Sequence, residues 1–109
     1  MAWLMRRGEV LASLERAGSP LERAKGFAPR QNDSVVLLVE PSRAAHSIGL
    51  HCPLDLAHLD AEMTVVRTTR LAPNRIALAR RGTRAFLEAP AGAFERWHLR
   101  PGDQLEISE

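Results

Sequence analysis

Residues 34–40 read SVVLLVE, an unbroken apolar run of valine and leucine between two polar residues. A short run of this kind, with no polar alternation, is typical of a β-strand that is buried on both faces. Pro41 follows at once and ends the strand, because proline has no N–H group to donate to a sheet. We therefore expect a central strand here, with other parts of the domain covering both of its faces.

Shorter strand patterns flank this segment on both sides. In residues 2–15, two apolar runs surround RRGE, which predicts a β-hairpin with Gly8 in its tight turn. A turn at Arg81-Gly82 separates two further extended segments. The remaining predicted strands cover residues 54–60, 63–69, 75–79, 84–89 and the end of 100–108, and the turn DAEM joins the first two of these.

Two short helices are expected. GSPLERAKGF contains Ser19 as an N-cap, Pro20 at the first helical position and Glu22 three residues after the cap, which together form a capping box. AGAFERWHL predicts a helical turn or two in which Phe94 and Trp97 share a face and anchor the helix to the core.

The 109 residues, with a hydrophobic fraction of 45% and a charged fraction of 26%, are those of one globular domain covering residues 1–109. Many short strands and few helices predict an α+β fold that is predominantly β. We expect a small curled sheet or partial barrel with two short helices.

The chain carries a single cysteine, Cys52, so no internal disulfide can form, which favours a reducing compartment. Acidic residues interrupt the N-terminal apolar run, and no stretch is long enough for a membrane helix. These features predict a cytoplasmic protein without a membrane partner.

Positive charge is concentrated between Glu62 and Glu88, where there is no acidic residue. This segment predicts an anion-attracting surface, although arginines on solvated strand faces are the simpler interpretation. The candidate anion-binding residues are Arg67, Arg70, Arg80, Arg81 and Arg84.

The stretch HSIGLHCPLDLAHLD, residues 46–60, is rich in groups that could bind a metal or titrate. Its histidines and cysteine lack the close spacings of a zinc site, so neither a metal nor a cofactor is expected. Asp55 and Glu88 lie in apolar surroundings, where carboxylates need partners. Either each carboxylate accepts backbone N–H groups or an arginine and fixes the fold, or His46, Asp55 and Glu88 line one polar pocket, in which His46 pairs with Asp55.

Three blocks of the chain resemble the bacterial and archaeal domain of unknown function 192 (DUF192) family. They are RAKGFAPR at residues 23–30, the opening positions His46, Ser47, Gly49, Leu50, Pro53, Leu54, Asp55 and Asp60, and residues 87–107. The resemblance implies a compact, mostly β single domain and no established activity. Cys52 stands where the family usually has phenylalanine, which implies a buried thiol.

The leading interpretation is a small non-enzymatic binding or interaction module with an unknown ligand or protein partner. The alternative is a small hydrolase-like enzyme that uses His46 with Asp55 or Glu88. A nucleic-acid contact through the arginines is a second alternative, weakened by the 5% aromatic content and the lack of a recognition motif.

Overall fold

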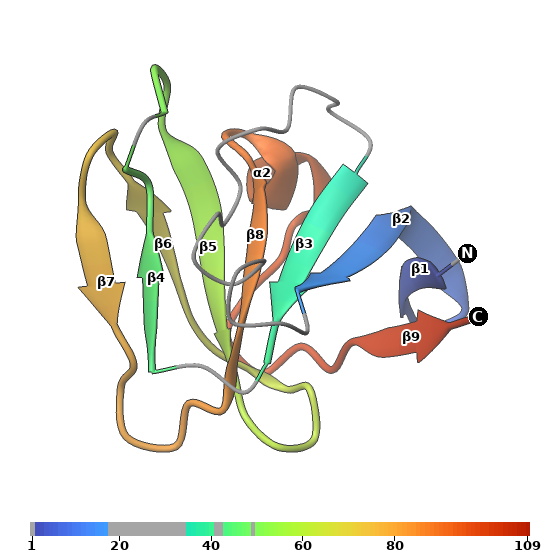
Figure 1. Cartoon of the computed structure of the whole chain (residues 1–109). Coiled ribbons are helices and arrows are strands. Elements are labelled where there is room, and N and C mark those ends of the chain that lie inside the picture. The colour runs from blue at the N-terminus through green and yellow to red at the C-terminus, as the bar shows by residue number, and fades with distance from the viewer. Residues whose placement is uncertain (1, 18–34, 41–42, 49) are drawn as a thin grey trace.

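The computed structural model describes residues 2–17, 35–40, 43–48 and 50–109 (Figure 1). Strands dominate this part of the chain, as the sequence predicted. In chain order, the elements are β1 (Ala2–Arg6), β2 (Glu9–Ala17), β3 (Val35–Val39), β4 (Ala44–His46), β5 (Leu54–Leu59), β6 (Val65–Leu71), β7 (Ile76–Leu78), β8 (Ala85–Pro90), α2 (Ala93–Trp97) and β9 (Glu106–Ser108). The predicted helix at residues 19–26 lies outside the described residues.

The strands form a seven-stranded sheet in the order β6-β5-β8-β3-β2-β1-β9 and a two-stranded sheet of β4 and β7. Pairing in the larger sheet is antiparallel except between β2 and β3, which run parallel. The larger sheet curls, and β4 and β7 stand beside it on the left of Figure 1. The predominantly β, curled-sheet architecture predicted from the sequence is confirmed.

Strand β3 separates two hydrophobic clusters, because alternate side chains of a strand project to opposite faces. Val36 and Leu38 belong to the larger cluster, called here the major core, which also includes Phe94. Leu37 and Val39 belong to a second cluster, the minor core, which is covered by β4 and β7 through Ala45 and Ala77. The prediction that this strand is buried on both faces is therefore confirmed.

The predicted tight turns are also present. Arg7 and Gly8 both have positive φ angles, of 53° and 80°, as a two-residue type I′ hairpin turn requires. Gly82, with a φ of 87°, occupies the second predicted turn. Glycine suits these positions because its φ can be positive without a steric clash.

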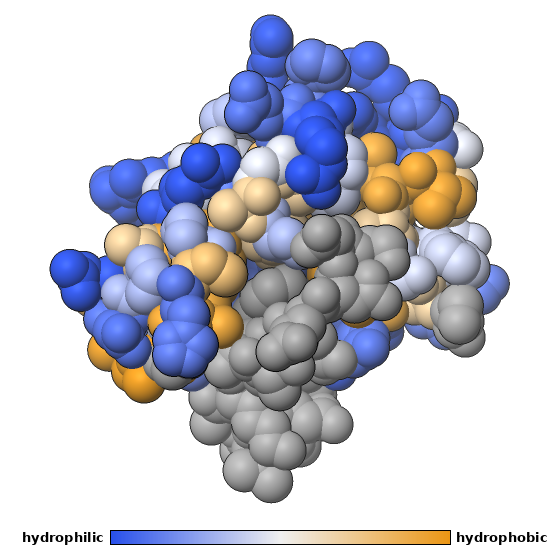
Figure 2. Space-filling model, turned by 90° about the horizontal axis from the view of Figure 1, so that it is seen from above, coloured by the Kyte–Doolittle hydropathy of each residue, from blue (hydrophilic) through white to orange (hydrophobic). Residues whose placement is uncertain are grey.

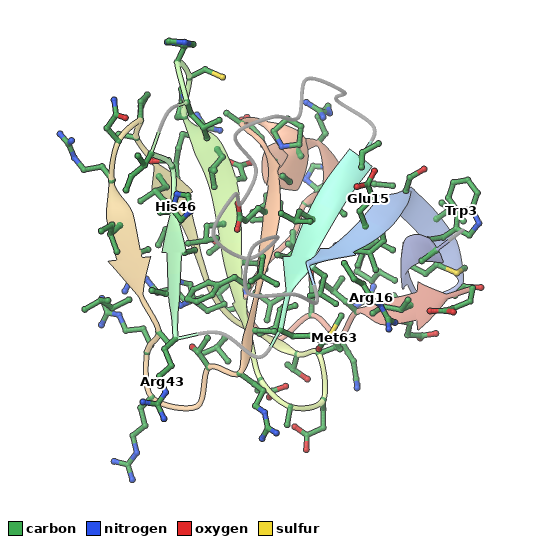
Figure 3. The ribbon with its side chains drawn as sticks, viewed as in Figure 1. Trp3, Glu15, Arg16, Arg43, His46 and Met63 are labelled. Carbon is green, nitrogen blue, oxygen red and sulfur yellow. The ribbon has the colours of Figure 1, made fainter. Side chains whose placement is uncertain are left out.

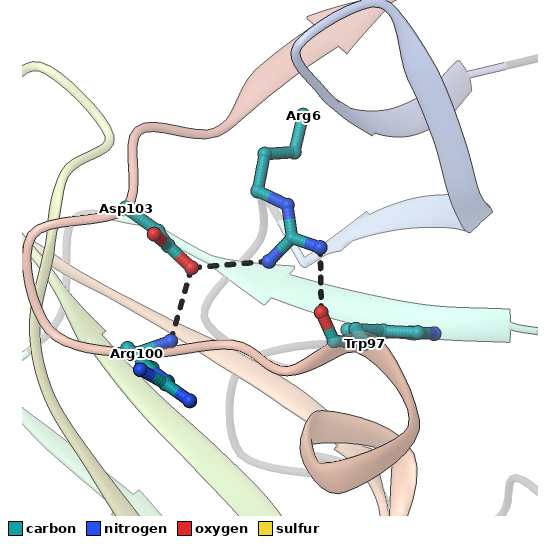
Figure 4. A network of polar contacts seen from close by, with 4 residues as sticks. All are labelled: Arg6, Trp97, Arg100 and Asp103. Atoms are coloured by element: carbon teal, nitrogen blue, oxygen red, sulfur yellow. Dashed lines mark hydrogen bonds and ion pairs between the residues drawn. The ribbon is translucent and has the colours of Figure 1, made fainter.

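A polar network ties the N-terminal hairpin to the C-terminal part of the chain (Figure 4). One terminal nitrogen of Arg6 pairs with Oδ2 of Asp103 at 3.0 Å, and the other donates to the carbonyl of Trp97 at 2.5 Å. The same Asp103 oxygen accepts the backbone N–H of Arg100. Because these residues lie far apart in sequence, the network fixes the position of the helix relative to the hairpin.

None of the helices within the described ranges is long and apolar enough to cross a membrane.

Helix α2 is held mainly by Phe94, which is buried in the major core, while Trp97 is only partly buried beside it. Their ring centroids are 5.8 Å apart. We expect Phe94→Ala to lower the free energy of unfolding by about 3–5 kcal/mol, because packing is lost and a cavity remains. Trp97→Ala should cost less, and urea denaturation of both variants measures the difference. Equal, small losses would mean that the helix is peripheral.

Candidate anion-binding site

Asp55 of β5 is a buried carboxylate, 4% exposed, that joins three elements. Its Oδ1 accepts from Nε of Arg70 on β6 at 3.1 Å. Its Oδ2 accepts the backbone N–H groups of Gly92 at 3.0 Å and Phe94 at 3.1 Å. The carboxylate thus caps the start of α2, where free N–H groups need an acceptor. The interpretation in which Asp55 accepts backbone N–H groups and an arginine is the one that the structure shows.

The structure does not bring Asp55 and Glu88 into one pocket. In the pairing of β5 with β8, Asp55 is opposite Ala89 and Leu56 is opposite Glu88. Directly paired residues project to the same face, and neighbours along a strand project to opposite faces. Asp55 therefore lies on the face of the major core, whereas Glu88, 1% exposed, lies on the face of the minor core.

His46 lies on β4, in the two-stranded sheet (Figure 3). Its Nδ1 accepts the backbone N–H of Ile48 at 3.3 Å. Within the described residues, the oxygens of Asp55 bond to Arg70, Gly92 and Phe94 rather than to His46. The three residues predicted for a polar pocket are thus distributed over two faces of the larger sheet and a second sheet.

The position of Cys52, in the loop before β5, differs from the prediction. Cys52 is exposed, not buried as its phenylalanine-like position implied, because it stands at the tip of the connection between β4 and β5 rather than in a strand. His51 beside it is also exposed. Among the described residues, no group of three or more histidine, cysteine, aspartate or glutamate side chains is arranged to hold a metal ion.

A pocket opens between β5, β6 and β7, and several arginines of the positively charged segment line it. Its volume is about 400 Å³, within the usual range of small-molecule sites. Its lining combines cationic and polar residues with apolar ones. The lining residues are His58, Arg67, Thr69, Arg70, Leu71, Ala77, Leu78 and Arg80.

His58 is the most unusual of these residues, because it is only 2% exposed and yet polar. It sits opposite Arg67 in the pairing of β5 with β6, and its ring meets the ring of Phe86 edge-on with centroids 4.8 Å apart. Its Nδ1 is buried without a hydrogen-bond partner in the described part of the chain, and so is Oγ1 of Thr69 in the same pocket wall. Buried polar atoms without partners are costly to stability, and both of these atoms are shielded from solvent although their residues line the pocket.

Electrostatics keep the imidazole neutral. Burial lowers the pKa of His58 below its ordinary value of 6.5, and the positive charge of Arg80 lowers this pKa further. A neutral imidazole beside two guanidinium groups leaves the pocket positive without an additional charge on the ring. The arrangement suits an anion, which would offset the repulsion among these groups.

The five arginines predicted to attract anions divide into two groups. Arg67, Arg70 and Arg80 line the pocket, although the guanidinium of Arg70 is already bonded to Asp55. Arg81 and Arg84 are exposed and are not among the lining residues. Only part of the predicted positive surface therefore belongs to a concave site.

His58 and Thr69 were not identified from the sequence. The one signal in the sequence was a histidine within a mostly apolar predicted strand. The register of β5 with β6, which includes an irregularity between His58 and Leu59, places His58 beside Arg67.

The fold and the pocket define a small, curled-sheet β domain with a cationic cavity at one edge. A sequence profile of the DUF192 family, described as an uncharacterized ACR, matches residues 2–107. The chain belongs to this family.

Similar proteins agree with this assignment. A UPF0127 protein of Pyrococcus abyssi is 28% identical over 98 residues, covering 85% of this chain and 84% of the relative. A crystal structure of a proposed transcription regulator from Sinorhizobium meliloti has a TM-score of 0.81 at 21% identity, covering 97% of this chain and 91% of that one. A Novosphingobium aromaticivorans protein of unknown function has a TM-score of 0.78 at 22% identity, covering 96% and 82%. At such identities the two structures show a shared fold.

The Asp55 contacts predict unequal effects of two substitutions. Asp55→Ala should destabilise the protein strongly, since each buried N–H left without an acceptor costs about 1–3 kcal/mol. Arg70→Ala should cost less, because the Arg70 side chain is 54% exposed and water can take over part of its hydrogen bond to Asp55. Urea unfolding of both variants tests this order; equal losses would show that the ion pair, not the helix cap, is the main contribution.

The lowered pKa of His58 predicts a pH-dependent stability. Below about pH 6.5 the unfolded chain binds a proton at this position that the folded protein takes up only at lower pH. The contribution of His58 to the free energy of unfolding is therefore fully present above about pH 6.5, and it is lost as the pH falls toward the pKa of His58 in the folded protein. His58→Gln should remove this part of the decrease in the urea midpoint between about pH 7.5 and about pH 5.

The exposed His51 provides the matched control. His51→Gln should leave the pH dependence of the urea midpoint unchanged. If both variants behaved as the unmodified protein does, His58 would not be the residue that carries the dependence.

Proposed function

We propose that this protein is a non-enzymatic binding module that holds a small anion in the pocket of His58, Arg67, Thr69 and Arg80. The single observation that carries the proposal is that Arg67 and Arg80 line one concave site together with the polar residues His58 and Thr69. An oxyanion would accept hydrogen bonds from the guanidinium groups and would offset the local positive charge.

The state of the two arginines supports this proposal. Within the described residues, neither Arg67 nor Arg80 forms an ion pair with a carboxylate. Arg67 is half-buried and Arg80 is exposed, and because both line the same concave site their two charges act together on an anion placed there. Arg70 is less suited to the role because it pairs with Asp55.

The enzymatic alternative needs His46 close to Asp55 or Glu88. Asp55 already has three hydrogen-bond donors and lies on the major-core face, so it is poorly placed to act as a base for His46. Glu88 remains the partner that this alternative would require. The position of Asp55, on the opposite face of the larger sheet from Glu88, weighs against the form of the hydrolase-like alternative that uses Asp55.

A nucleic-acid contact is the second alternative, and one comparison bears on it. The Sinorhizobium meliloti neighbour is described as a proposed transcription regulator, and Arg81 and Arg84 are exposed on this chain. Such a contact would draw on the exposed arginines as well as the pocket, because phosphate backbones are bound by extended positive surfaces.

The exposed thiol of Cys52 supports the cytoplasmic location that the sequence predicted, since reducing surroundings keep such thiols free.

Sulfate is a suitable first probe, and its binding can be followed by NMR shifts of the His58 ring and by calorimetry. Arg67→Gln or Arg80→Gln should each weaken sulfate binding roughly 10-fold or more, since a hydrogen bond from a charged group contributes about 1.5–3 kcal/mol. Unfolding curves of the variants should stay close to that of the unmodified protein, because both residues lie at the pocket wall.

The matched controls are Arg81→Gln and Arg84→Gln, which remove the same charge from the same segment outside the pocket. They should change sulfate affinity less than about twofold. Equal weakening by all four substitutions would indicate diffuse surface attraction and contradict the pocket. Binding of duplex DNA that depends on Arg81 and Arg84 would favour the nucleic-acid alternative.

A further inference from the structure

The size of the pocket exceeds what a bare inorganic anion fills. A water molecule occupies about 30 Å³ of liquid, so a five-atom oxyanion such as sulfate takes up at most about 150 Å³. The cavity measures about 400 Å³. More than half of the space would therefore be left over once an anion lay between Arg67 and Arg80.

The remaining wall of the pocket is apolar. Leu71 of β6 and Ala77 of β7 pack against the minor core and present apolar surface to the cavity. Leu78 also lines the cavity, yet it is 71% exposed, the highest value among the exposed large apolar side chains. An apolar group of a ligand placed against Leu78 would remove this surface from water, which is favourable.

We infer that the ligand is an amphipathic anion: an oxyanion head between Arg67 and Arg80, carrying a short apolar chain that packs on Leu71, Ala77 and Leu78. This inference rests on the proposed function, because it names the class of ligand for the same pocket. Carboxylate and phosphate heads share the chemistry that the guanidinium groups recognise. The apolar chain of the ligand, rather than its head group, distinguishes this class of ligand from inorganic anions.

Figure 2 shows one face of the molecule, on which small apolar patches interrupt a mostly hydrophilic surface. Two exposed apolar side chains of β7 make the contribution of such surface testable. Ile76 and Leu78 are both exposed on β7, but only Leu78 lines the cavity. The two leucine-sized side chains on one short strand thus provide a test residue and a matched control.

The inference is tested by calorimetry with sulfate, acetate, butanoate and hexanoate, and with methyl and butyl phosphate as a second head group. Each methylene buried in the pocket should strengthen binding roughly three- to fourfold, until the chain extends beyond Leu78. Butyl phosphate should bind more tightly than methyl phosphate, by the same factor in affinity per methylene, if both head groups fit the pocket. A gain limited to one series would identify the head group.

Leu78→Ser should abolish most of the gain of hexanoate over acetate and leave sulfate affinity unchanged. Ile76→Ser should preserve the gain, because its side chain does not line the cavity. Equal loss in both variants would indicate nonspecific adhesion to the strand and overturn the inference.

The two levels of proposal fail in different ways. If sulfate and acetate bind in an Arg67-dependent manner but chain length has no effect, the amphipathic ligand is excluded and the anion-binding function stands. If no anion binds at any chain length, the proposed function itself fails.

Discussion

The buried carboxylate of Asp55 is the contact on which the rest of this small domain depends. It holds β6 through Arg70 and the start of α2 through two backbone N–H groups, while its own strand lies at the centre of the pairing between β6 and β8. A buried charge is tolerated only when it is fully hydrogen-bonded. The position of the helix over the major core is therefore coupled to the position of the strand that carries the pocket.

That coupling explains why Asp55, which lies in a stretch rich in titratable side chains, has a structural role. Gly92 has a φ of 94° and contributes no side-chain cap to α2, so the helix takes its acceptor from a strand 37 residues earlier in the chain. A helix of five residues has little stability of its own and needs tertiary contacts. Asp55 and the packing of Phe94 supply these contacts together.

Sheet pairing creates the pocket from residues that are individually unremarkable. Arg67 and His58 face each other across β5 and β6, and Arg80 approaches from the segment after β7. Arg67 and Arg80 lie where the edge strand of the larger sheet passes the smaller sheet, and neither pairs with a carboxylate in the part of the chain that the structure describes. The result is a neutral buried histidine in a positive cavity, which is a setting for binding rather than for stability.

The sequence by itself determined most of the strands, several turns and the two-sided burial of residues 35–39, because periodicity and turn residues are local properties. It did not predict the short strand β4. It also indicated that Asp55 and Glu88 are buried and that positive charge is concentrated between residues 63 and 87. Only the tertiary structure decided which buried groups meet. The register of β5 with β8 places Asp55 and Glu88 on opposite faces, and the register with β6 places His58 beside Arg67. A shift of one residue in either register would exchange the faces. Local sequence does not specify the register of β5 with β8, which are distant in the chain, or the irregularity between His58 and Leu59 that shifts the register of β5 with β6.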